Sequence, residues 1–150
     1  MFKLVLIAAL SLPVLTTGCA TSQNVTLAQI SGVKQLSTVA LVPSEGNSAD
    51  MDAAIKSAFL AQGVAPKQAL PAGTRKSSEV DVIVDYTDQW RWDLVMYLRS
   101  VTLNMYDADA GNLLVTGRWD NSAFHGFQDY KAVVKGLIDD MVAKIKARPK

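Results

Sequence analysis

The sequence has one cysteine and one histidine in 150 residues. A single thiol excludes an internal disulfide, and a single imidazole excludes a His-rich or Cys/His zinc site. A Ser-His-Asp triad would have to use His125 as its base. His125 lies in the segment SAFHGF, which has the composition of a loop, and a lone loop histidine is usually a surface or packing residue. We therefore predict no metal site, no cofactor and no catalytic residue, and so a protein that is not an enzyme.

Neither sign of charge is in excess, with 15 Lys and Arg against 14 Asp and Glu. Nucleic-acid-binding domains usually carry a basic patch or stripe, and this chain has no long basic run. The glycines stand apart from one another, so no phosphate-binding glycine loop is present. The composition predicts no nucleic-acid partner.

Long apolar runs are missing except at the amino terminus. Lys3 precedes an apolar stretch from Leu4 to Leu15, and the small residues Thr16, Thr17 and Gly18 follow it. Twelve residues rise only about 18 Å as a helix, which is too short for a hydrocarbon core of roughly 30 Å. The layout predicts a secretory signal peptide over residues 1–18 and no transmembrane helix.

Thr17, Gly18 and Cys19 resemble the end of the lipobox of bacterial lipoproteins, although Thr16 stands where a leucine is usual. The resemblance implies acylation of Cys19 and anchoring to a membrane, and Ala20 implies sorting to the outer membrane, facing the periplasm. Several acyl chains give a stable anchor, because each buried methylene contributes about 0.8 kcal/mol. The alternative is an ordinary signal peptide followed by an incidental cysteine, which would leave a free thiol in an oxidising compartment.

The remaining chain divides into a tether and one domain. Residues 19–36 are rich in Ser, Thr, Asn and Gln, and we expect the acylated cysteine and a flexible tether there. Residues 37–150 predict a single periplasmic domain. Within it, Ser48 can cap a helix that ends at Gly63. A second helix begins after Asp129 and runs to Pro149, with apolar residues at helical spacing through four turns.

Short apolar or alternating segments between the helices predict strands. We expect them over residues 39–42, 80–92, 96–106 and 113–119, with a further short strand over 64–69, a turn between Trp92 and Met96, and a hairpin connection over 107–112. These elements predict an α+β fold. It is a two-layer sandwich in which two amphipathic helices cover one face of a mostly antiparallel sheet of four to five strands.

The strand over residues 80–92 separates apolar from polar side chains by parity. If it is unbroken, Trp90 and Trp92 share the apolar face with Val82 and Val84 and belong to the core. Both tryptophans also lie in an aromatic-rich segment of the kind that forms docking surfaces, so the two interpretations stay open. The opposite, uncovered face would then bind a protein partner through four polar residues: Asp85, Thr87, Gln89 and Arg91.

The same segment resembles a group of small Gram-negative envelope lipoproteins of unassigned function. The shared pattern is Trp-x-Trp-Asp-x-x-Met-Tyr-Leu followed by a Tyr-Asp hairpin, and it is matched here by Trp90, Trp92, Asp93, Met96, Tyr97, Leu98, Tyr106 and Asp107. The resemblance implies an α+β lipoprotein domain and brings no activity with it.

These observations predict a non-enzymatic outer-membrane lipoprotein whose periplasmic domain binds a protein partner or supports an envelope assembly. The alternative is a carrier of an apolar envelope molecule such as a lipid, which requires an internal cavity. A hydrolase built around His125 is the least favoured interpretation.

Overall fold

The computed structural model describes residues 21–29, 35–122 and 127–147, so the predicted signal peptide, Cys19 and His125 lie outside the described residues. Six strands and two helices follow one another along the chain: β1 (Ser22–Leu27), β2 (Thr38–Leu41), α1 (Ala49–Ala61), β3 (Ala65–Pro66), β4 (Val82–Asp93), β5 (Val95–Asp107), β6 (Leu113–Asp120) and α2 (Tyr130–Lys146). None of the helices in these ranges has the length and apolar character needed to cross a membrane.

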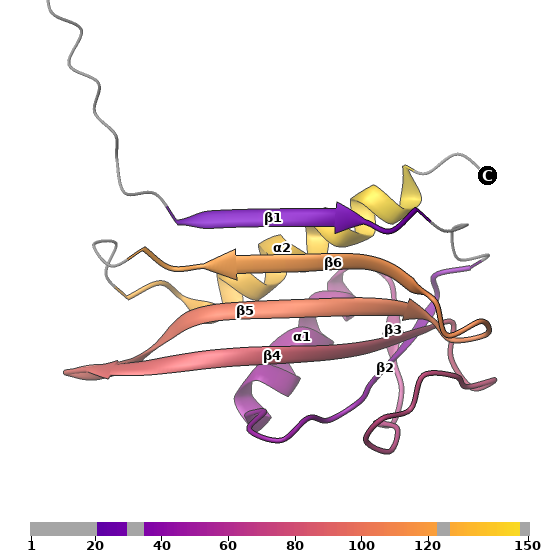
Figure 1. Ribbon diagram of the computed structural model, residues 1–150, viewed down its shortest axis with the longest axis horizontal. Coiled ribbons are helices and arrows are strands. Elements are labelled where there is room, and N and C mark those ends of the chain that lie inside the picture. The colour runs from indigo at the N-terminus through magenta and orange to yellow at the C-terminus, as the bar shows by residue number, and fades with distance from the viewer. Residues whose placement is uncertain (1–20, 30–34, 123–126, 148–150) are drawn as a thin grey trace, which may run out of the picture.

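The strands form one mixed sheet with the order β1-β6-β5-β4-β2-β3. β1, β6, β5 and β4 pair antiparallel, whereas β2 pairs parallel with both β4 and β3. α1 connects β2 to β3, as a crossover between two parallel strands requires. Both helices lie against the same face of the sheet (Figure 1). The α+β class and the two amphipathic helices are therefore confirmed.

Local sequence signals set the ends of the helices. The Ser48 side chain accepts a hydrogen bond from the backbone N–H of Met51, and Gly63 follows the α1 C-cap with a φ of 75°. Asp129 caps α2 by accepting from the N–H of Lys131. These contacts satisfy backbone groups that a helix end leaves without partners, and they match the predicted caps.

The main core lies between the helices and the sheet. α1 contributes Met51, Ile55, Ala58 and Phe59; α2 contributes Val134, Leu137, Ile138, Met141, Val142 and Ile145. A smaller core lies on the helix-free face and consists of Ala40, Val42, Val80, Ile83 and Ala108, with Leu70 and Tyr106 packed against it. The segment between β3 and β4 therefore covers part of the face that was predicted to be uncovered.

Two sequence predictions need correction. The sheet has six strands, where four to five were predicted, and it is mixed, although three of its five pairings are antiparallel as expected. The additional strand is β1, which lies inside the predicted tether and pairs with β6 over its whole length. β1 is an edge strand of sequence SQNVTL in which only Val25 is buried, so its composition resembles that of a polar linker. Its order comes from backbone pairing, which composition does not reveal.

Candidate interaction surfaces

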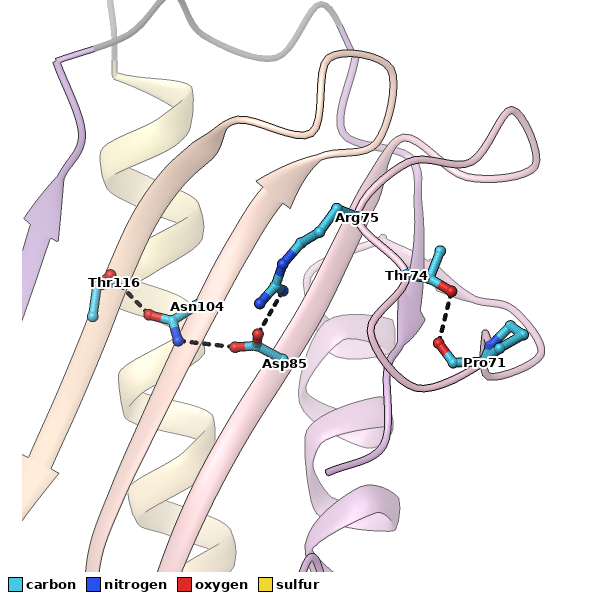
Figure 2. A network of polar contacts seen from close by, with 6 residues as sticks. All are labelled: Pro71, Thr74, Arg75, Asp85, Asn104 and Thr116. Atoms are coloured by element: carbon cyan, nitrogen blue, oxygen red, sulfur yellow. Dashed lines mark hydrogen bonds and ion pairs between the residues drawn. The ribbon is translucent and has the colours of Figure 1, made fainter. Parts of the chain in front are cut away.

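A polar network crosses three elements on the helix-free face of the sheet (Figure 2). An Asp85 carboxylate oxygen on β4 accepts from Arg75 Nη1 at 2.6 Å, and its other oxygen accepts from Asn104 Nδ2 on β5 at 2.8 Å. Asn104 in turn accepts from the Thr116 hydroxyl on β6 at 2.9 Å. The network holds the segment that carries Arg75 down on the sheet.

Arg75 makes two contacts that hold this segment against the sheet. Its guanidinium lies 4.2 Å from the centre of the Tyr106 ring, a cation–π contact, while it pairs with Asp85. The hydrogen bond to Asp85 holds the pKa of Arg75 above its ordinary value. Burial raises the pKa of Tyr106, and the nearby charge of Asp85 adds to this rise. Arg75 is thus a fixed structural cation at the border of the smaller core.

The four predicted partner-binding residues share one face, but they are not equivalent. Asp85 is engaged by Arg75 and Asn104, and its side chain is only 17% exposed. Thr87, Gln89 and Arg91 are exposed further along β4, beyond the covering segment. Three of the four positions therefore remain accessible, and Asp85 is a structural residue.

The exposed part of this face continues onto the neighbouring strands. Arg118 on β6 forms an ion pair with Asp120 and donates to the Thr102 hydroxyl on β5. We call this surface the open face; it comprises Thr87, Gln89, Arg91, Thr102, Arg118 and Asp120. Its groups are hydroxyls, an amide and charges of both signs, which suit hydrogen bonding to another protein surface.

The two tryptophans of β4 have different environments. Trp90 packs against the main core, its ring lies 5.4 Å from that of Tyr130 at the start of α2, and its Nε1 donates to Asp88. Trp92 is 70% exposed. The register of β4 and β5 shifts at Gln89/Trp90, but the alternation of faces along β4 persists. The core interpretation therefore holds for Trp90 and the surface interpretation for Trp92, because the strand runs on past the end of the helix layer.

The β4–β5 hairpin projects beyond the rest of the sheet (Figure 1, left). Its end carries exposed apolar side chains: Trp92 (70%), Leu94 (85%), Val95 (46%) and Met96 (57%). We call these four residues the hairpin tip. Leu94 alone separates the paired residues Asp93 and Val95, and it has a φ of 62°, which glycine or asparagine normally occupies. The turn was predicted at this place, but its exposure was not.

Between the helices lies a groove of about 480 Å³. Its lining combines small side chains with four charged ones, and comes from α1 (Asp50, Ala53, Ala54, Ser57, Ala58 and Ala61) and from the start of α2 (Asp129, Tyr130, Lys131, Ala132 and Lys135). A groove with this many charges does not favour a lipid. Within the described ranges, no three His, Cys, Asp or Glu residues are grouped to hold a metal ion.

Comparisons with known proteins identify the fold alone. No family model matches the chain, and no curated protein matches it. Two solved structures of the PelC dodecamer from Paraburkholderia phytofirmans are similar. The L103M form has a TM-score of 0.58 and a sequence identity of 17%, and the match covers 86% of this chain and all of the PelC chain. The second structure has a TM-score of 0.57 and a sequence identity of 14%, and the match covers 87% of this chain and all of the PelC chain. A PDZ domain protein from Parabacteroides distasonis is similar with a TM-score of 0.51 and 9% identity over 87% of this chain and 37% of its own.

Proposed function

We propose that this chain is a non-enzymatic cell-envelope lipoprotein. Acylated Cys19 holds it at the outer membrane on the periplasmic side, and the domain docks a protein partner of an envelope assembly. The observation that carries the docking proposal is the open face. The two helices cover one face of the sheet and the segment around Arg75 covers part of the other, while Thr87, Gln89 and Arg91 stay exposed on β4.

The anchor is supported by the lipobox-like residues Thr17, Gly18 and Cys19 after a short apolar segment. Replacing Cys19 by Ser removes the acceptor thiol, so palmitate incorporation and lipoprotein-type signal cleavage should both be lost. The measurement is metabolic labelling with palmitate together with membrane fractionation. Undiminished palmitate labelling of the Cys19→Ser chain would show that the anchor lies elsewhere.

The docking proposal is tested on Arg91. Its guanidinium is exposed on the open face, and arginine is enriched at the energetic centres of protein interfaces. Arg91→Ala should reduce the amount of envelope partner that copurifies with the tagged protein, with an almost unchanged melting temperature. The matched control is Lys67→Ala, which removes an exposed cation just after the edge strand β3. If the same amount of partner copurified with Arg91→Ala as with the parent chain, the open face would not be the docking site.

A second copy of this chain is a second candidate for the partner. The similar PelC structures are dodecamers, so a domain of this fold assembles with itself in that protein. Light scattering of the purified lipoprotein in detergent, with and without Arg91→Ala, separates the two candidates. An oligomer that Arg91→Ala dissociates favours self-assembly, and a monomer favours a different protein.

The alternative function, a carrier of an apolar molecule, finds less support. The groove between α1 and α2 carries Asp50, Asp129, Lys131 and Lys135 on its walls. The side chains beneath the sheet fill the main core, in which Leu103, Met105 and Ile138 are fully buried. Extraction of the purified protein with organic solvent and lipid analysis would test this alternative directly.

A further inference from the structure

The hairpin tip concentrates exposed apolar side chains at one place. Six large apolar residues are exposed among the described residues, and four of them are Trp92, Leu94, Val95 and Met96. A fifth, Phe127, lies beside the hairpin, with its ring 5.6 Å from that of Tyr97. Exposed apolar residues scattered singly need no explanation, but a contiguous apolar patch marks an interaction site.

Leu94 adds an independent observation about the same place. Its left-handed backbone conformation is costly for a branched side chain, and glycine or asparagine would relieve the strain. Leu94 is also the most exposed of these six residues, at 85%. The chain therefore places a large apolar side chain at a strained and fully projecting position, a combination that points to a role in contact with something apolar.

The register of the sheet places the predicted anchor at the same end. Ser22 of β1 pairs with Asp120, Asp120 pairs with Ser100, and Ser100 pairs with Gln89, so these four residues lie at one level across four strands. β1 starts at this level, and the β4–β5 hairpin continues past it to Leu94. Figure 1 shows the start of β1 and the hairpin at the same end of the molecule.

The lengths of the two segments beyond this level are comparable. Cys19 is three residues before Ser22, a reach of at most about 10 Å for an extended chain. Leu94 is five residues beyond Gln89, about 17 Å along a strand. The first and fourth strands are about 14 Å apart across the sheet. An acyl group on Cys19 would therefore bring the hairpin tip down on the same bilayer surface.

We propose that the hairpin tip is a second membrane contact, in which Trp92, Leu94, Val95 and Met96 enter the interfacial layer of the bilayer that the Cys19 lipid anchors. This inference rests on the proposed acylation of Cys19. Trp is enriched at the level of the lipid headgroups, and Leu and Met reach the acyl boundary. Asp93 stands directly before the apex, so the contact is shallow. Two contacts at one end of the sheet hold the strands upright on the membrane and turn the β5–β6 connection away from it.

The test uses the full, acylated lipoprotein with a single reactive cysteine added. Leu94→Cys and, as the matched control, Ala110→Cys are labelled with an environment-sensitive fluorophore; Ala110 is exposed at the β5–β6 connection, at the far end of the sheet. Each protein is reconstituted in vesicles of phosphatidylethanolamine and phosphatidylglycerol. We expect a blue shift and several-fold protection from iodide for the label at position 94, with quenching by lipids that carry a nitroxide near the headgroup, and no change for the label at position 110.

Each outcome decides between the proposals. If iodide quenches the labels at positions 94 and 110 equally, the membrane contact is overturned. Palmitate bound to the protein in the same preparation would show that the proposed anchor is nevertheless present. Absence of palmitate overturns both the anchor and the membrane contact. The label at position 94 could be protected in isolated outer membranes but not in vesicles that contain no other protein. That result would overturn the membrane contact and show that the hairpin tip binds a protein partner. A Trp92→Ser, Met96→Ser chain should lose the protection while its melting temperature stays unchanged.

Discussion

Trp90 and Trp92 lie two residues apart on the same side of β4, and their surroundings differ completely. Trp90 contacts Tyr130 and the main core, whereas Trp92 is 70% exposed at the hairpin tip. Trp90→Ala should therefore lower the free energy of unfolding by about 2–3 kcal/mol, somewhat below the range for a fully buried tryptophan. Trp92→Ala should change it by less than about 0.5 kcal/mol. Urea unfolding of the two variants measures both values; a larger loss for Trp92→Ala would mean that the tip packs against the domain.

Asp81 fixes the register between β2 and β4. One carboxylate oxygen accepts hydrogen bonds from the backbone N–H of Ser37, the N–H of Thr38 and the Thr38 hydroxyl, at 2.9 to 3.0 Å. Burial alone would raise the pKa of Asp81, but these hydrogen bonds outweigh it and hold the pKa below its ordinary value. The carboxylate is therefore needed as a charged acceptor in the folded state.

The pKa of Asp81 leads to a pH-dependent prediction. Because its folded-state pKa is lowered, Asp81 stabilises the fold above the ordinary pKa of about 3.9 and loses this contribution as the pH falls through the folded-state value. Asp81→Asn should cost about 1–2 kcal/mol at pH 7, and the difference from the parent chain should shrink in acid. Chemical unfolding at several pH values measures this, with the exposed Glu79→Gln as control. A difference that stays constant with pH would contradict the role of the charge.

Substitutions at Gly117 and Gly136 would test how closely α2 packs against the sheet. A Cβ at Gly117 on β6 would lie 2.5 Å from Met141 Sδ and 3.0 Å from Leu137 Cδ1, so the absent side chain lets α2 approach the sheet. A Cβ at Gly136 within α2 would meet only Gln23 Oε1, at 4.0 Å. The two positions differ in packing space, while the substitution is the same.

Gly117→Ala should destabilise the domain by about 1–3 kcal/mol, the usual cost of overpacking a core. Gly136→Ala should stabilise it by about 0.5–1 kcal/mol, because alanine loses less backbone entropy than glycine in a helix interior. Thermal unfolding of both variants, recorded side by side, gives the two signs. If both variants melted above the parent chain, the close approach of α2 to β6 would be refuted.

In the folded domain, a segment with the composition of a tether forms β1, the edge strand of the sheet. It pairs with β6, and the carbonyl oxygen of Val25 accepts a hydrogen bond from Lys144 Nζ of α2. Gln23 also donates to Asp140 of α2. β1 therefore joins the second layer as well as the sheet, and the domain begins only three residues after the predicted lipid attachment site.

Hydrogen exchange distinguishes this strand from a tether. The amides of residues 22–27 that pair with β6 should exchange much more slowly than those of an unstructured chain, because exchange requires the edge to open. Mass spectrometry of a peptide that covers residues 21–29 measures the protection. If this peptide exchanged completely at the earliest time point, residues 22–27 would be part of a flexible tether and not a strand. Protected amides would leave only a short link between the domain and the proposed anchor at Cys19.

Elements with strong local signals could be predicted from the amino-acid sequence. Ser48 and Asp129 cap their helices as expected, the apolar residues at helical spacing in α2 form its buried face, and the Asp107–Asn112 connection forms the expected hairpin turn. Capping, helical periodicity and turn chemistry depend on residues a few positions apart, so the sequence carries them directly. It also grouped Thr87, Gln89 and Arg91 on one face, since parity along a strand is a local property.

Features that depend on contacts between distant segments could not be predicted in this way. β1 is a strand because β6 offers it backbone partners, and Asp85 is unavailable because Arg75 reaches it from another segment. Trp92 is exposed because the hairpin extends beyond α1 and α2, and the length of a helix layer relative to a strand is not encoded near that strand. Alternation assigns a side chain to a face, but burial requires that another element covers that face.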